Sequence, residues 1–460
     1  MGVLCHNIKV LKKINIFFKK NWIILTIILL GLFLRAYRYP EFPIMGETAD
    51  ETAWAILGAS LIQERQPTSW SYFGAYQDFI YQDNGDNIAP LVRPALDHPP
   101  LFSLIPGFFH TLKNSWDQTP SIKLIRFPMI LIGAFNVWLL YLVAKKIFKE
   151  KTIAHLATLI YAVVPTFVFG SRLVVAENLL VTWMLLAIYL IKSQSKHKNL
   201  FLIFVGVVAI LTKVSGLIIP FGILLYGWQK SEKQIAKIGL LGLILGEFSY
   251  CLYGALLNWQ LFLKINLSQA DRDLGLSTLL NRLFLHPSVV EKFFFDGWLI
   301  LGLFAMIAWL LIKPKKYLII KIYAVLWLAF IAATAGEQTF HGWYDYPLYP
   351  LLALSIAWFI YYITTKKIYW LIWLGWLFVL PTIRLALVFS NQYAEISNFS
   401  LRLIMGLGAL PLGFSFMKKD KFAQKSILFL GMLLLIAGIT TVIAINSRDY
   451  WEMDQFFSTR

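Results

Sequence analysis

Charged residues are scarce in this chain of 460 residues. They make up 15% of it, whereas 58% of the residues are hydrophobic and 16% are aromatic. A typical soluble domain carries about 25% charged residues, and the mean hydropathy of the chain is +0.65. These proportions exclude a soluble globular domain and indicate a polytopic membrane protein.

Cysteine is almost absent as well. Cys5 lies near the N-terminus and Cys251 inside an apolar run, so we expect no disulfide between them and no cysteine-bound metal. Acidic residues are fewer than basic ones, which gives a formal charge of +17. The lysines form short groups between apolar runs rather than one basic domain. This pattern is typical of cytoplasmic loops and argues against a nucleic-acid partner.

Apolar runs long enough to span a bilayer alternate with these lysine groups. Every second connection is short and lysine-rich, as the positive-inside rule requires, and merging the fifth and sixth runs would break this alternation. The sequence therefore predicts an all-α protein of about 13 transmembrane helices in the cell membrane, with a cytoplasmic N-terminus and an extracytoplasmic C-terminus. The runs cover approximately residues 22–37, 124–147, 152–169, 173–192, 199–213, 215–228, 236–257, 295–312, 317–335, 346–364, 368–387, 400–417 and 425–445.

The opposite connections carry nearly all the carboxylates, histidines and loop tryptophans. The first of them, residues 38–123, is the longest, and the segment 258–294 is predicted to be a second outer loop. A site at the outer membrane surface is therefore favoured. A transporter more typically holds its ionisable residues near the bilayer midplane, within broken helices.

Two groups of polar residues stand out in the first outer loop. Three carboxylates lie within residues 47–51, and the following residues predict an amphipathic helix over 51–64 that lies along the membrane surface. Asp97 and His98 precede two prolines, so we expect a new helix to start at Leu101. Acidic groups beside a bilayer need water, a metal or a charged substrate. The alternative is a solvated loop whose acids cap helices.

These motifs together resemble the GT-C glycosyltransferases that use polyprenyl-phosphate sugars, a superfamily with the protein O-mannosyltransferases and the aminoarabinose transferases of lipid A. The likeness covers roughly the first half of the chain, and the second half matches in topology only. The motifs that carry it are Ala49-Asp50-Glu51, Asp97-His98-Pro99-Pro100-Leu101, Arg126-Phe127-Pro128, the run from Ser171 to Asn178, and Leu211-Thr212-Lys213.

The resemblance implies an inverting membrane glycosyltransferase of GT-C architecture. Such an enzyme transfers one sugar from a polyprenyl-phosphate donor to a hydroxyl of a protein, lipid or glycan acceptor at the outer face of the membrane. The chain then divides into a cytoplasmic N-terminus (1–21), a catalytic transmembrane module (22–257) that includes loop 38–123, an outer loop (258–294) and a C-terminal transmembrane module (295–460).

Three carboxylates are predicted to be catalytic. In this reaction a carboxylate takes or orients the hydroxyl proton, and cations stabilise the departing phosphate. We predict that Asp50 is the general base, that Glu51 assists next to it, and that Glu177 is a second acid at the acceptor site. The alternatives are that Asp50 caps helix 51–64 and that Glu177 pairs with Arg172 as a helix-end anchor.

Four further residues are predicted to bind substrates, namely Arg172, Lys213, His98 and Tyr344. Lys213 would meet the lipid phosphate as a mobile point charge, or else extend its ammonium toward water as a snorkelling lysine. Tyr344 would touch a sugar, or else belong to the aromatic belt at the membrane interface.

The resemblance also implies a divalent metal. By likeness to the aminoarabinose transferases Asp97 is a metal ligand, together with His341, and a carboxylate with an imidazole suits zinc or another transition metal. The alternative for His341 is a plain interfacial histidine. His98 replaces a lysine of those transferases and Ala53 replaces a phosphate-binding arginine, so lipid A is not implied as the acceptor. Two other functions stay open: a transporter or flippase of a lipid-linked glycan, and an inactive scaffold that binds lipid phosphate.

Overall fold

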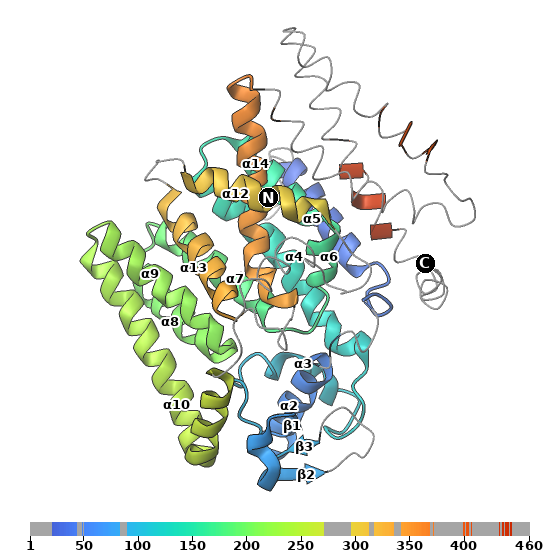
Figure 1. Cartoon of the computed structure of the whole chain (residues 1–460), viewed down its shortest axis with the longest axis vertical. Coiled ribbons are helices and arrows are strands. Elements are labelled where there is room, and N and C mark those ends of the chain that lie inside the picture. Colours follow the sequence, from blue (N-terminus) through green and yellow to red (C-terminus); the bar gives the residue numbers. More distant parts are fainter. Residues whose placement is uncertain are drawn as a thin grey trace, which may run out of the picture.

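The computed structural model describes residues 21–43, 48, 50–82, 90–270, 296–311, 317–334 and 342–368, with isolated positions beyond them. Figure 1 shows a bundle of long helices with a smaller unit of short helices and strands at its lower end. The polypeptide of the small unit comes from the predicted first outer loop, and it lies beside the lower end of the bundle.

The first ten predicted spans all correspond to helices. The last three lie largely outside the described residues, so the total of about 13 stays a prediction. Among the described helices, three segments are long and apolar enough to cross a membrane (Ile122–Ile147, Lys233–Ala270 and Gly342–Thr365), and seven are shorter apolar helices. The helices are Asn21–Ala36, α4 Ile122–Ile147, α5 Lys151–Val163, α6 Pro165–Gly170, α7 Glu177–Ile191, α8 Lys198–Thr212, α9 Ile218–Gln229, α10 Lys233–Ala270, α12 Gly297–Leu311, α13 Leu318–Thr334 and α14 Tyr349–Thr365.

The chain reverses at Lys213, where the sequence separated spans five and six. Lys213 is fully extended (φ −162°, ψ 148°), and the 3₁₀ turn η2 (Val214–Leu217) leads into α9. A Cβ on Gly216 would lie 2.0 Å from the carbonyl oxygen of Ala209, so only glycine lets the turn fold back onto the end of α8. The separation of these two helices, which the positive-inside rule required, is confirmed.

Predicted span three is interrupted, and the helix of predicted span four begins later than expected. Pro165 lacks an amide hydrogen and begins the short helix α6. An irregular stretch over 171–176 then precedes α7, which starts at Glu177. Glu177 is therefore the first residue of a helix and not one turn inside it. The partial positive charge of a helix N-terminus favours a carboxylate there.

The outer unit packs two helices backbone to backbone. It contains α2 (Asp50–Glu64), α3 (Leu104–Thr111), the 3₁₀ helix η1 (Gly74–Phe79) and strands β1 (Ser69–Trp70), β2 (Ile80–Gln82) and β3 (Leu91–Val92) in the antiparallel order β1-β3-β2. A Cβ on Gly58 would lie 1.8 Å from the carbonyl oxygen of Ser103, and one on Gly107 would lie 2.3 Å from the carbonyl carbon of Gly58. Glycine is thus needed on both helices.

The predicted helix after Asp50 is present, but its surroundings differ from the expectation. Every residue from Trp54 to Ser60 is buried, so α2 does not expose one apolar face to lipid along this stretch. The close contact with α3 covers one side, and strand β1 contacts the helix through a hydrogen bond from Ser69 to the carbonyl of Ala53, at 3.0 Å. The new helix after the two prolines begins at Leu104, slightly later than expected.

The helix α10 continues past the expected start of the second outer loop and folds back on itself. Asn258 has extended torsion angles, and its side chain accepts a hydrogen bond from the amide of Leu261 at 3.0 Å. Beyond this kink Phe262 packs on Gly254. Gln269 then donates a hydrogen bond to the carbonyl of Asp97, at 2.7 Å. The end of α10 therefore supports the loop that carries Asp97.

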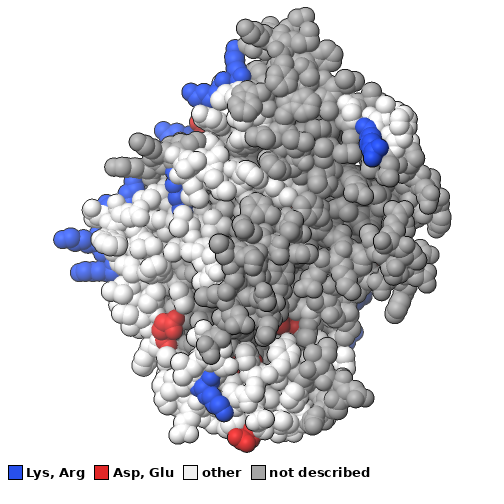
Figure 2. Space-filling model, in the orientation of Figure 1, with Lys and Arg blue, Asp and Glu red and all other residues white. Residues whose placement is uncertain are grey.

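Charge is distributed unevenly along the molecule. In the view of Figure 2 most of the visible Lys and Arg side chains lie in the upper half, and most of the acidic ones lie below. The outer unit with α2 and the sheet occupies the lower end of the same view (Figure 1). This separation agrees with basic loops on one side of the membrane and an acidic site on the other.

Candidate active site

Buried arginines hold the backbone of the first helix and of the residues just after it. Arg172 donates to the carbonyl oxygens of Leu34 (2.5 Å), Phe42 (2.8 Å) and Tyr37 (3.0 Å). Arg35 donates to three other carbonyls, those of Gly31, Ala162 and Tyr161. Both guanidinium groups are fully buried. The predicted substrate-binding residue Arg172 therefore shapes the backbone that leads to Asp50.

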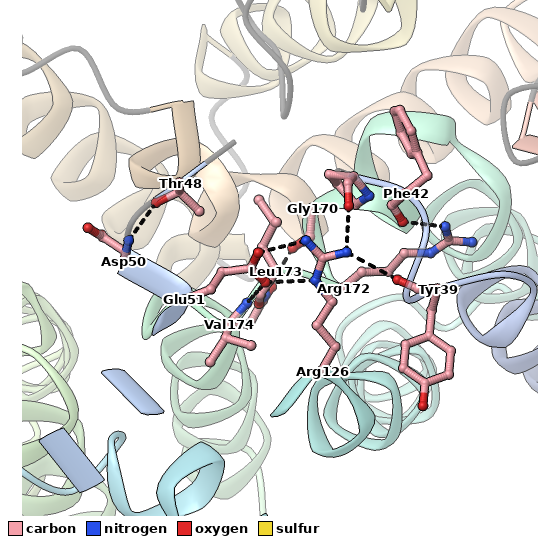
Figure 3. Close-up of polar contacts among 12 residues, drawn as sticks. Tyr39, Phe42, Thr48, Asp50, Glu51, Arg126, Gly170, Arg172, Leu173 and Val174 are labelled. Atoms are coloured by element: carbon pink, nitrogen blue, oxygen red, sulfur yellow. Dashed lines mark hydrogen bonds and ion pairs between the residues drawn. The ribbon is translucent and has the colours of Figure 1, made fainter. Parts of the chain in front are cut away.

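Glu51 belongs to the same anchor. Its carboxylate forms a two-pronged ion pair with Arg126, at 2.8 Å to Nε and 2.6 Å to Nη2 (Figure 3). The amide of Val174 donates to Oε1 at 3.0 Å. Arg126 also donates to the carbonyl of Pro43, at 2.5 Å. Glu51 and Arg126 are both buried, so they join α2, α4, the stretch before α7 and the linker.

Asp50 has a different environment from its neighbour. It is the first residue of α2 and is partly exposed. Its amide donates to the hydroxyl of Thr48 at 3.1 Å, and Figure 3 shows the Asp50 carboxylate pointing away from the Glu51–Arg126 pair. A side-chain oxygen that accepts from an amide two residues later is a capping contact. Thr48 makes this contact, so capping by Asp50 is not needed to explain the helix start.

Glu177 and Lys213 form a buried ion pair. The Lys213 ammonium is 2.6 Å from Oε1 of Glu177, and both side chains are at most 10% exposed. Lys213 also lies over the ring of Tyr344, 4.7 Å from its centroid. The sequence left open a pair between Glu177 and Arg172, but the ion pair found joins Glu177 to Lys213. Three of the predicted site residues are thus in contact.

Asp50 belongs to the same charged group. Lys213 lies in the turn outside the helices, where burial on its own lowers the pKa of the ammonium, but Glu177, Tyr344 and Asp50 together outweigh that effect and raise the pKa above its ordinary value. Lys213 therefore stays protonated at neutral pH. One protonated lysine among two carboxylates and an aromatic ring can hold an anion beside a base.

Tyr346 is a residue of this region that sequence reasoning did not select. It lies in the 3₁₀ helix η5 (Gly342–Leu348) and is 1% exposed. Its ring presses on Gly170, where a Cβ would come within 2.8 Å of Cζ. The charges of Glu177, Glu51 and Arg126 all act on its hydroxyl. No motif marked it, and a tyrosine close to Tyr344 in the sequence is typical of the aromatic belt at the membrane interface.

Asp97 and His98 lie in the outer unit and are held firmly. Asp97 accepts hydrogen bonds from the hydroxyls of Ser71, at 2.7 Å, and Tyr76. The ring of His98 stacks on Trp54, with centroids 4.6 Å apart and planes inclined by 20°. The structure thus gives Asp97 two hydroxyl donors and His98 an aromatic partner on α2.

This arrangement does not by itself fit a metal site. Both carboxylate oxygens of Asp97 accept hydrogen bonds from hydroxyl groups, and no group of three or more potential ligands occurs among the residues that the structure describes. The other predicted ligand, His341, lies outside those residues. The metal stays an expectation from the resemblance, and no step of the chemistry below depends on it.

Comparison with known proteins adds independent information. Residues 97–250 match the family model described as dolichyl-phosphate-mannose-protein mannosyltransferase. The matched part includes Arg126, Arg172, Glu177 and Lys213, while Asp50 lies before it. No curated protein sequence matches the chain.

Solved structures resemble the whole chain despite low identity. ArnT from Cupriavidus metallidurans bound to undecaprenyl phosphate has a TM-score of 0.54 and 11% identity, over 93% of this chain and 77% of that one. The same protein in the apo state has a TM-score of 0.52 and 13% identity, with the same coverage of both chains.

The archaeal oligosaccharyltransferase AglB from Archaeoglobus fulgidus, in complex with an inhibitory peptide and a dolichol-phosphate, gives a TM-score of 0.50 at 12% identity over 92% of this chain. The chain spans 56% of the length of that enzyme. Identities this low establish the fold alone. The chain is a membrane protein with the fold of the GT-C glycosyltransferases, as its motifs predicted.

Proposed function

We propose that the protein transfers one sugar from a polyprenyl-phosphate donor to an acceptor hydroxyl at the outer face of the membrane, with inversion at the anomeric carbon. The observation that carries this proposal is the contact of Lys213 with Glu177 and Tyr344 beside the partly exposed Asp50. The similar structures support it, since ArnT was solved with undecaprenyl phosphate and AglB with a dolichol-phosphate.

The residues divide the chemistry between them. The ammonium of Lys213 stabilises the negative charge that develops on the leaving phosphate. Asp50, partly exposed at the start of α2, takes the proton of the acceptor hydroxyl or orients it. Glu177 holds Lys213 in place before the donor binds.

Glu51 has a supporting part in this proposal. Three hydrogen bonds already engage its carboxylate, two from Arg126 and one from the amide of Val174. Both of its oxygens are directed at Arg126 and Val174 and not toward a substrate hydroxyl. We therefore assign Glu51 to the anchor that positions Asp50.

The test is the variant Asp50→Asn, which keeps the shape of the side chain but removes the base. Base catalysis contributes about 10²–10⁴-fold, so transfer from a polyprenyl-phosphate sugar should fall at least about a hundredfold. Binding of polyprenyl phosphate should persist or tighten, because a negative charge near Lys213 is removed. The matched control is Asp78→Asn, on the exposed surface of η1.

Normal turnover by Asp50→Asn would show that Asp50 is not the base. If only Glu51→Gln lost transfer activity, the base would be Glu51 instead. A flippase without catalysis would still move lipid-linked glycan across vesicles after Asp50→Asn and would show no transfer in the wild type. Mass spectrometry of the acceptor separates these outcomes.

A further inference from the structure

Two buried polar atoms beside the candidate site have no hydrogen-bond partner among the residues that the structure describes. Within the described part of the chain, neither Oε2 of Glu177 nor the hydroxyl of Tyr346 makes a hydrogen bond. Leaving such a buried group without a hydrogen bond is unfavourable. The carboxylate oxygen is an acceptor, and the hydroxyl can donate.

The backbone around Gly170 brings the two residues together. Asn178, which follows Glu177 on α7, donates to the carbonyl of Gly170 at 2.9 Å. The ring of Tyr346 lies against Gly170. Tyr346 is therefore fixed beside the first turn of α7, and its hydroxyl has little freedom except rotation about its own bond.

The Lys213 ammonium cannot keep its short ion pair with Glu177 and bind a donor phosphate equally closely. The ion pair is short, at 2.6 Å, and the ammonium lies between Glu177 and the ring of Tyr344. A phosphate that draws the ammonium toward itself lengthens this pair. A buried carboxylate left without its partner is strongly unfavourable, so donor binding needs a second partner for Glu177.

We propose that Tyr346 is this second partner: when the donor phosphate engages Lys213, the Tyr346 hydroxyl donates a hydrogen bond to Oε2 of Glu177. The proposal rests on the proposed function, since it assumes that Lys213 binds the donor phosphate. The terminal torsion of a glutamate is broad and allows the carboxylate to turn. Tyr346 is thus a positioning residue that makes release of Lys213 possible without leaving a buried charge unpaired.

The proposal predicts that Tyr346→Phe weakens donor binding without lowering stability. Tyr346→Phe removes a hydroxyl that has no partner in the described part of the chain, so the unfolding temperature of the donor-free protein should be unchanged or slightly higher. Binding of polyprenyl phosphate should weaken about ten- to a hundredfold, the value of a hydrogen bond to a charged group. The matched control is Tyr253→Phe on α10, whose buried hydroxyl also lacks a partner among the described residues.

A double-mutant cycle separates positioning from simple packing. In a Glu177→Gln background the carboxylate charge is gone, so adding Tyr346→Phe should change binding by no more than about twofold. Equal losses in both backgrounds, or equal effects of Tyr346→Phe and Tyr253→Phe, would overturn the proposal.

A further variant tests the phosphate role of Lys213 separately from the role of Tyr346. Lys213→Met in the Glu177→Gln background removes the ammonium without leaving a buried charge. If the Glu177→Gln protein binds polyprenyl phosphate and the added Lys213→Met does not weaken that binding, the phosphate role of Lys213 fails, whatever Tyr346 does. If Lys213 matters and Tyr346 does not, only the present inference fails.

Discussion

Adjacent carboxylates at the start of α2 have opposite environments. Asp50 is partly exposed and near Lys213, whereas Glu51 is buried against Arg126. The helix turns by about 100° per residue, so neighbouring side chains point to different surroundings. The sequence selected Asp50 as the base but did not reveal the anchoring role of Glu51, because the partner of Glu51 lies 75 residues away along the chain.

The anchor makes a prediction about stability. Glu51→Ala leaves the buried Arg126 without its carboxylate, and breaking a buried pair in this way costs about 3–5 kcal/mol. We expect a large drop in the thermal unfolding temperature in detergent, while Asp50→Ala changes it little. Equal stability of the two variants would contradict the assignment of Glu51 to the anchor.

At the scale of elements, residue spacing predicted where helices lie better than where they break. The ten described spans follow from apolar runs, and the turn at Lys213 follows from the lysine pattern. The fold-back at Asn258 and the burial of α2 were not predicted. They depend on Gly254 and Gly58, whose partners in space no local pattern reveals.

The contact between α2 and α3 can be tested directly. Gly58→Ala places a methyl group within 1.8 Å of the carbonyl oxygen of Ser103, so the helices must separate. Overpacking of this kind costs about 1–3 kcal/mol and moves Asp50. We expect lower transfer activity and a lower unfolding temperature. Gly74→Ala is the control, because its Cβ would meet no described residue within 4 Å. Equal behaviour of both variants would refute the close contact.

At the scale of the whole molecule, the positive-inside rule gives a testable topology. Reporter fusions after Asn446 should be active only outside the cell, since lysine groups recur at alternate loops. A fusion after Lys233 should report the cytoplasmic side. A cytoplasmic signal after Asn446 would refute the count of about 13 spans and the outer position of the C-terminus.

The site itself combines predicted and unpredicted parts. Asp50, Glu177, Lys213 and Tyr344 were selected from motifs, and the structure brings them together. Tyr346 and the anchoring role of Arg126 escaped, because their importance depends on burial and on partners from distant segments. The sequence offered one signal for the role of Arg126, namely an arginine within an apolar run. Arg35 shares this feature.

The carbonyl contacts of Arg35 have a consequence for biosynthesis. Its partners at Tyr161 and Ala162 follow it by 126 and 127 residues. At about 5–20 residues per second, the ribosome reaches them roughly 6–25 seconds after the first helix has been made. Until then the guanidinium has to stay hydrated at the membrane surface. Assembly of the site finishes later still, however early its first carboxylates are translated, because Glu177, Lys213 and Tyr344 all follow α5 in the chain.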